Sequence, residues 1–370
     1  MKLNDILVEA VNKGASDIHL KVGLPPVVRI NKKIVPLGYL GRLTEETILY
    51  FLDKVVKTKT KRSELLQKGE VDLSYSIAGV SRFRVNVYKQ RGTYAFAFRV
   101  LKTHIPSLDE LMLPPQLKDI ALANRGLILV TGPTGSGKST TLASMIEYRN
   151  ENKNNVIVTI EDPIEFVFKD RKSYIVQREI GADTLSFSSA LRAALREDPD
   201  VIMVGEMRDI ETIETALRAA ETGHLVFSTL HTQDAKETIT RIIDVFPIEN
   251  QNHIRLLLSA TLYAIISQRL IPRKDGEGVV PAVEILINEG AVREAIADRE
   301  KFHDIRKLME KGREQYGMQT FDQSILDLYN KGYISYEDTL AYASNPADLE
   351  LKIKGISSSE DYGTGFFEDI

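Results

Sequence analysis

The 370-residue sequence contains no cysteine. Disulfides, and zinc or iron–sulfur sites with cysteine ligands, are therefore excluded. The sequence also lacks a long hydrophobic run. The opening MKLNDILVEAVNKGASD has no apolar core of the kind that a signal peptide needs, and LLLSATLYAIIS (256–267) is too short and too polar to cross a bilayer. We therefore expect a cytoplasmic protein that works at a membrane only as a peripheral partner.

An excess of basic residues is missing as well. Lysine and arginine total 48 against 52 acidic residues, which gives a net charge of -4. Proteins that coat nucleic acid usually carry a positive balance, so this composition argues against a nucleic-acid partner. The remaining composition, 43% hydrophobic and 27% charged, is that of a soluble chain, and its length suggests two or three domains.

Changes of pattern divide the chain into five parts. Residues 1–101 alternate short strand patterns with a helical one, typical of an α+β domain, and the proline-punctuated residues 102–117 are the best candidate linker. In residues 118–287, apolar strands alternate with helical stretches, which indicates a parallel sheet covered on both faces. Residues 288–352 are helical in pattern. The acidic, Gly/Ser-rich residues 353–370 are expected to be disordered.

The segment GPTGSGKS, residues 132–139, fits the phosphate-loop pattern G-x-x-x-x-G-K-[ST] in full. It follows an apolar strand pattern and opens a helical one, which is the context that the motif requires. Its glycines let backbone N–H groups point at phosphates, and the helix N-terminus favours negative charge. We expect Lys138 to reach the β- and γ-phosphates and Ser139 to bind Mg²⁺. This reading is preferred over a plain Gly-rich turn.

Two other strand patterns end in acidic residues. VIMVGE (201–206) ends at Glu206, as a Walker B strand should, and VTIEDPIEF (158–166) includes Glu165. Because parallel strands present their carboxyl ends to one crevice, these acids are expected to converge with the phosphate loop. Glu206 could hold Mg²⁺ through water or position the attacking water. The sequence leaves open whether Glu165 or Glu206 is the general base.

Histidines and arginines supply the remaining candidates. His231 stands just beyond the strand pattern of GHLVFSTLHT (223–232), where it could sense the γ-phosphate, whereas His224 fits a structural role better. Two histidines at opposite ends of one strand are too far apart to share a metal. Arg84 and Arg99, on neighbouring strand patterns, could act on the ATP of an adjacent subunit. Periodicity alone favours the other interpretation, in which these are exposed strand arginines without a catalytic role.

LREDPDVIMVGEMRD (195–209) resembles the signature segment of the type II/type IV secretion and pilus ATPases. ASDIHLKVGLPPVVRINKKIVPL (15–37) is similar to the opening of the type IV pilus retraction ATPases of twitching motility, and the resemblance runs from about residue 3 to 350. The short N-terminal domain, the lack of cysteine, and a partial match of residues 291–305 to the family's helical AIRNLIRE segment favour retraction over assembly. In that segment Glu294 and Ala295 replace the usual Asn and Leu.

This resemblance implies an α/β fold in which a PAS-like N-terminal α+β domain is joined to a RecA-like P-loop ATPase domain with C-terminal helices. It implies a homo-hexameric ring that hydrolyses ATP with Mg²⁺ at the cytoplasmic face of the inner membrane, against the pilus platform protein. Glu206 would be the Walker B acid near Mg²⁺, Glu165 the general base, and His231 a nucleotide contact. Arg84 and Arg99 would reach the γ-phosphate as the ring closes. The ATP-binding loop residues would be Gly132, Pro133, Thr134, Gly135, Ser136, Gly137, Lys138, Ser139 and Thr140.

Other functions fit parts of the pattern. A pilus assembly or secretion ATPase is the alternative within the same family. A nucleic-acid translocase could use the same core, although the acidic charge balance and the lack of a basic and aromatic stripe weigh against it. A small-molecule kinase would need an acceptor pocket and usually acts without a ring.

Overall fold

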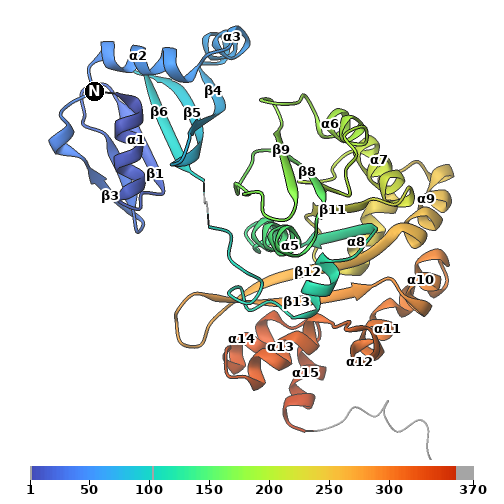
Figure 1. The fold of residues 1–370 in the computed structure, drawn as a ribbon. Coiled ribbons are helices and arrows are strands. Elements are labelled where there is room, and N and C mark those ends of the chain that lie inside the picture. Colours follow the sequence, from blue (N-terminus) through green and yellow to red (C-terminus); the bar gives the residue numbers. More distant parts are fainter. Residues whose placement is uncertain (1, 102–103, 356–370) are drawn as a thin grey trace, which may run out of the picture. The chain divides into compact units, whose positions relative to one another are not determined.

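The computed structural model describes residues 2–101 and 104–355, which form two compact units (Figure 1). The first unit comprises the N-terminal chain through Ile105 together with residues 161–169 and 178–186. The second comprises residues 106–160 and 170–177 and the chain from Phe187 onward. The domain boundaries drawn from sequence remain predictions. Most of the predicted acidic tail lies outside the described residues.

The first unit contains a six-stranded antiparallel sheet in the order β3-β2-β1-β6-β5-β4. Along β5, Phe83, Val85 and Val87 are buried, whereas Arg82 and Arg84 occupy the opposite face, as the period of two predicts. The buried face forms the core with its helices. The elements are α1 (Leu3–Asn12), β1 (Asp17–Lys21), β2 (Val27–Ile30), β3 (Lys33–Pro36), η1 (Gly38–Leu40), α2 (Glu45–Val55), α3 (Lys59–Lys68), β4 (Glu70–Ile77), β5 (Ser81–Gln90) and β6 (Thr93–Val100).

Local signals account for most of these elements. The Thr44 side chain accepts a hydrogen bond from the Thr47 N–H at 3.2 Å and so caps α2 at the predicted position. Helix α3 was not predicted, because its sequence KTKRSELLQK buries only Leu65 and shows little apolar periodicity. It is instead defined by its ends, where Thr58 accepts from the Lys61 N–H and Gly69 adopts a left-handed conformation.

The second unit contains a seven-stranded sheet in the order β13-β12-β7-β11-β10-β8-β9. Strand β7 is buried along its whole length, as expected for the centre of a sheet covered on both faces. The elements as far as the last strand are α4 (Gln116–Ala121), β7 (Gly126–Thr131), α5 (Lys138–Asn152), β8 (Val156–Glu161), β9 (Tyr174–Glu179), α6 (Phe187–Ala194), β10 (Val201–Val204), α7 (Ile210–Glu221), β11 (Leu225–Leu230), α8 (Ala235–Asp244), α9 (Ile248–Thr261), β12 (Leu262–Pro272) and β13 (Val279–Ile287).

The prediction of a parallel sheet holds for the ladders that join β8, β10, β11, β7 and β12. It fails at β13, which pairs with β12 in antiparallel orientation. The apolar run 256–267 changes from helix to strand, because α9 ends at Thr261 and β12 begins at Leu262. Hydrophobicity alone does not distinguish a buried helix from a buried strand, so this change escaped the sequence.

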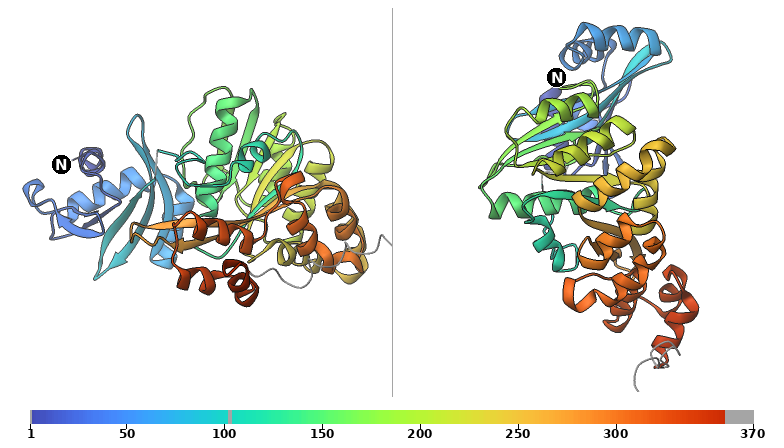
Figure 2. Two further views of the ribbon diagram at one scale, coloured as in Figure 1. Left: turned by 90° about the horizontal axis from the view of Figure 1, so that it is seen from below. Right: turned by 90° about the vertical axis from the view of Figure 1, so that its right-hand side faces the viewer.

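The C-terminal helices are α10 (Gly290–Ala297), η2 (Lys301–Asp304), α11 (Ile305–Lys311), α12 (Arg313–Tyr316), α13 (Phe321–Asn330), α14 (Tyr336–Tyr342) and α15 (Pro346–Ile353). Figure 2 shows α13 to α15 gathered beside the β12–β13 pair. Phe321 and Ile325 of α13 pack there against Ile271 and Val280. Among the described helices, none has the length and apolar character to span a membrane.

A buried acid lies between β13 and α8. The Glu284 carboxylate accepts a hydrogen bond from the Ala235 N–H, the first of α8, at 2.9 Å. Burial raises the pKa of Glu284 from 4.5 to about 7, with a further increase from Asp234, while the Ala235 N–H and Arg269 oppose it. The folded protein therefore binds this proton more tightly than the unfolded chain.

The stabilisation from that proton is fully present below about pH 4.5 and is lost as pH rises through about 7. As the pH rises from 5 to 8, we expect deprotonation of Glu284 to lower the free energy of unfolding by about 3 kcal/mol. Glu284→Gln, which imitates the protonated form, should remove most of that dependence. Urea unfolding at several pH values measures it, with the exposed Glu277→Gln as control. Parallel pH profiles for Glu284→Gln and the wild type would contradict the assignment.

Candidate functional site

The phosphate loop occupies residues 132–137, between β7 and α5. Gly132, Gly135 and Gly137 have φ values of 144°, 84° and 88°, which side chains with a Cβ rarely adopt. Space is also limiting. A Cβ on Gly132 would lie 2.4 Å from the Gln268 carbonyl oxygen, and one on Gly137 would lie 2.8 Å from Gln268 Nε2. Backbone conformation thus favours glycine at all three positions, and close packing adds a second constraint at Gly132 and Gly137.

The phosphate loop contains hydrogen-bond donors of the kind that bind phosphate. Lys138 Nζ donates to the carbonyls of Gly132 at 2.8 Å and Pro133 at 2.9 Å, which keeps the ammonium group at the loop. Ser136 Oγ is buried and has no hydrogen-bond partner in the described structure. The 15-residue helix α5 starts at Lys138 without a side-chain cap, so its first N–H groups face the loop. These groups fit the phosphates of a nucleotide.

A chain of charged and polar groups extends from Lys138 to the end of β10. Lys138 Nζ lies 3.5 Å from His231 Nδ1, and His231 Nε2 lies 3.8 Å from Glu206 Oε2. Arg208 Nε lies 2.7 Å from the same carboxylate oxygen. The structure therefore brings together three residues predicted from sequence, Lys138, His231 and Glu206. Sequence reasoning missed Arg208, although its place two residues after Glu206 was an available signal.

His231 is held in its neutral form. Burial lowers its pKa, as do the charges of Lys138 and Arg208, while Glu206 opposes them. An ammonium group only donates, so Nδ1 is the acceptor toward Lys138 and the ring proton is assigned to Nε2, on the side of Glu206. His231, Glu206 and Arg208 also line a cavity of about 390 Å³. A neutral imidazole there adds a hydrogen-bond donor without adding charge.

The described residues contain no cluster of three or more histidines and acids that could hold a metal ion by themselves. At nucleotide sites Mg²⁺ is usually bound by one or two protein oxygens together with substrate phosphates. The hydroxyl of Ser139 and the carboxylate of Glu206 are oxygen donors suited to that cation. The donor set therefore fits a Mg²⁺ ion that arrives with ATP.

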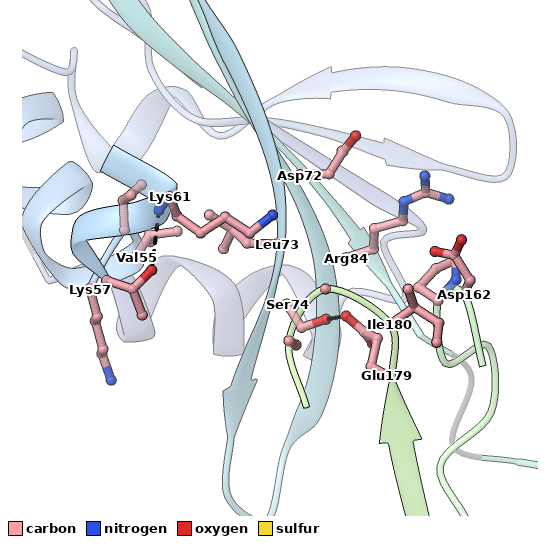
Figure 3. A pocket seen from close by; sticks show the side chains of 15 residues that line it. Val55, Lys57, Lys61, Asp72, Leu73, Ser74, Arg84, Asp162, Glu179 and Ile180 are labelled. Carbon is pink, nitrogen blue, oxygen red and sulfur yellow. Dashed lines mark hydrogen bonds between the residues drawn. The ribbon is translucent and has the colours of Figure 1, made fainter. Parts of the chain in front are cut away.

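Arg84 and Arg99 belong to the first unit and are register partners on β5 and β6. Arg99 Nε donates to Asp17 Oδ1 at 3.0 Å, although its side chain remains 68% exposed. Arg84 is exposed and has no hydrogen-bond or ion-pair partner among the described residues. It lines a cavity of about 480 Å³ with Ser74 and Asp162 (Figure 3). One of the two predicted arginines is thus paired and the other is free.

Glu165 is exposed and also belongs to the first unit. A nearby acid that sequence reasoning missed, Glu179, is buried and accepts hydrogen bonds from Ser74 Oγ, from Arg82 Nη2 at 2.9 Å and from the Ile164 N–H at 3.3 Å (Figure 3). Glu179 therefore ties the segment that carries Glu165 to β4 and β5. The convergence of Glu165 with the phosphate loop stays a prediction.

The glycine loop, the acid that follows β10 and the mixed sheet around β7 define a P-loop ATPase with a RecA-like core, joined to a PAS-like N-terminal domain. The family model for "Type II/IV secretion system protein" matches residues 1–315. The chain belongs to this family.

Relatives match along nearly the whole chain. The chain is 44% identical to "Type IV pilus retractation ATPase PilT" of Pseudomonas aeruginosa, over 94% of this chain and 100% of that protein. It is 51% identical to "Twitching motility protein" of Neisseria gonorrhoeae, over 88% and 86%. The structure titled "Crystal Structure of the Pilus Retraction Motor PilT and Bound ADP" is 51% identical, with a TM-score of 0.84, covering 95% of this chain and 99% of that one.

Lys138→Ala should abolish ATP hydrolysis, because it removes the only side-chain cation of the loop motif itself. Steady-state phosphate release measures the effect, and we expect a loss of at least about a thousandfold. Lys274→Ala, at an exposed lysine of the same unit, is the control and should leave the rate unchanged. Normal turnover by the Lys138 variant would show that the loop is not part of the active site.

Proposed function

We propose that this chain is the motor ATPase that drives type IV pilus retraction in twitching motility. The carrying observation is the match along essentially its whole length to a retraction ATPase, with the glycine loop, Lys138, His231 and Glu206 gathered in one unit. The absence of cysteine favours retraction over assembly. We infer that six copies form a ring at the cytoplasmic face of the inner membrane, against the pilus platform protein.

In this proposal the loop binds the ATP phosphates through its N–H groups, Ser136 Oγ and Lys138. Bound Mg²⁺, held by Ser139 and Glu206 with the phosphates, would neutralise charge on the β- and γ-oxygens. Glu165 takes the proton of the attacking water as general base. His231 donates a hydrogen bond from its Nε2–H to an oxygen that gains negative charge. The Arg208 contact holds the Glu206 carboxylate in place.

Arg84 and Arg99 act across the subunit boundary in this proposal. They would approach the γ-phosphoryl group of the neighbouring subunit and stabilise the charge that develops there. Among the described residues Arg84 has no hydrogen-bond or ion-pair partner that it would have to leave. Arg99 must leave Asp17, but the Arg99 side chain is 68% exposed, so solvent screens this ion pair and the exchange costs on the order of 1 kcal/mol. ATP cleavage and product release would then become movements of the N-terminal domain, with residues 102–117 as the hinge.

The two candidate bases can be separated by amide substitution. Glu165→Gln should retain ATP binding but lower the turnover rate by about 10²–10⁴, because the attacking water loses its proton acceptor. Glu206→Gln should instead remove a proposed Mg²⁺ ligand, so that ATP binding depends less on the Mg²⁺ concentration. Equilibrium nucleotide binding and single-turnover hydrolysis distinguish the two, with Glu221→Gln at an exposed position as control. Trapping of uncleaved ATP by Glu206→Gln alone would reverse the two roles.

The arginines can be tested by mixing subunits. Arg84→Ala and Arg99→Ala should each lower ATP hydrolysis by about 10³ or more, because the transition state loses a cation. Mixing either variant with Lys138→Ala should restore part of the activity, because some interfaces then pair an intact loop with an intact arginine. The exposed Arg42→Ala is the control and should need no rescue. Failure of every mixture would place the arginines in their own subunit's site or outside catalysis.

A cell lacking this chain tests the direction of the motor. Loss of retraction should leave abundant surface pili and abolish twitching, whereas loss of an assembly ATPase should leave no pili. Electron microscopy of surface pili, combined with a motility assay, separates the two outcomes. Complementation with Lys138→Ala should fail, and complementation with Lys274→Ala should succeed.

A further inference from the structure

Strand β12 forms the side wall of the phosphate loop. It pairs in parallel with β7, where Ser267 is the register partner of Thr131, the last residue before the loop. The Thr131 hydroxyl donates to Ser267 Oγ at 2.9 Å in the buried interior. The next residue of β12, Gln268, therefore lies level with the loop itself. No feature of the sequence motif pointed to this residue, because it is 131 positions away from Gly137.

The Gln268 side-chain amide makes two short hydrogen bonds on either side of the loop's end. Its Nε2 donates to the Ser136 carbonyl at 2.7 Å, and its Oε1 accepts from Thr141 Oγ1 at 2.7 Å. Gln268, Ser136 and Thr141 are only 3%, 3% and 1% exposed. Ser136 belongs to the loop, whereas Thr141 belongs to the first turn of α5. One amide thus joins the loop to the helix that follows it.

We propose that Gln268 is a positioning residue of the ATP site, which holds the phosphate loop in the conformation that accepts phosphate. The chemistry of the two partners suits an amide, since one end donates to a carbonyl and the other accepts from a hydroxyl. A glutamate would present no donor to Ser136 when ionised. Buried groups that lose their partners are costly, so the bridge is maintained as a unit.

The packing of the loop supports this inference independently. Both Gly132 and Gly137 approach Gln268 so closely that neither could carry a Cβ without displacing it. The bridge also fixes the Ser136 backbone, and the buried Ser136 Oγ is the hydroxyl left free for a ligand. Gln268 would act on nucleotide through Ser136 rather than by contact.

Strand β12 also contacts the C-terminal helices through its opposite face. Successive side chains of a strand point to opposite sides, and the neighbour of Gln268, Arg269, faces the C-terminal helices. Arg269 Nη1 donates to the Tyr342 carbonyl at 2.9 Å, and its guanidinium stacks 3.8 Å above the centre of the Phe321 ring. Adjacent residues of β12 therefore support the phosphate loop on one side and bind the helical layer on the other.

The inference rests on the proposed nucleotide role of the loop, and ADP is the probe that tests both. Gln268→Met keeps the approximate volume but removes both hydrogen bonds. We expect it to bind ADP about tenfold more weakly by calorimetry, which corresponds to about 1.4 kcal/mol. Gln319→Met is the matched control, because Gln319 is a buried glutamine of the same unit whose Nε2 donates to the Val283 carbonyl at 2.7 Å, away from the loop.

Both variants should lower the unfolding temperature without nucleotide, but Gln319→Met should bind ADP within twofold of the wild type. A Gln268→Met protein that binds ADP within twofold of the wild type would overturn the proposal, since its hydrogen bonds would then be structural only. Thr141→Val provides a second variant if Gln268→Met does not fold. It removes one bond and should weaken ADP binding about threefold, and wild-type affinity would overturn the proposal equally.

Coupling between the two residues gives a sharper readout. If the bond between Gln268 and Thr141 is part of the bridge that positions Ser136, the Gln268→Met/Thr141→Val double variant should bind ADP less weakly than the product of the two single effects implies. Strict additivity would refute the bridge. Lys138→Ala keeps this test separate from the proposed function. Loss of ADP binding in Lys138→Ala supports the nucleotide site whatever Gln268 does, whereas undiminished binding there would refute the site itself.

Discussion

The second unit depends on a tight contact between the backbone of the phosphate loop and strand β12. A loop that turns its N–H groups inward must adopt left-handed conformations, and such a loop has little rigidity of its own. Here the missing rigidity comes from a neighbouring strand that approaches too closely for any Cβ at Gly132 or Gly137. The energetic value of the arrangement lies in preorganisation, because the loop need not be ordered when phosphate arrives.

Electrostatics follow from this placement. Lys138 is held at the loop by backbone carbonyls, and a neutral imidazole separates it from the Glu206 carboxylate. The neutral state of His231 has a physical cause in burial and in two neighbouring cations. The acid is paired with Arg208 instead of lying open to the lysine. The site therefore distributes charge along a chain of side chains, ready for a strongly anionic ligand.

The first unit supplies a different kind of chemistry. Its antiparallel sheet buries one face and presents arginines on the other. In the part of the chain that the structure describes, Arg84 is unpaired, and Arg99 is held by the partly buried Asp17. Buried Glu179 meanwhile accepts a hydrogen bond from Arg82 Nη2 and ties strand β5 to the segment around Glu165. On strand β5, Arg82 is therefore held by a buried acid, whereas Arg84 is exposed to solvent. Cations that can change partners at small cost suit the role proposed for Arg84 and Arg99 at the site of a neighbouring subunit.

The sequence by itself determined the phosphate loop, the acid at the end of β10, the position of His231 and the α/β class, because these depend on local spacing and on strand periodicity. Helix α3 and the α9–β12 boundary escaped it, since their patterns are weak or ambiguous. Only the tertiary structure decided that β13 runs antiparallel, that Arg208 holds Glu206 and that Gln268 bridges Ser136 and Thr141. The antiparallel pairing and the Gln268 bridge join residues that are distant along the chain. For Arg208 proximity in sequence was not enough, because the direction of a side chain is set by packing.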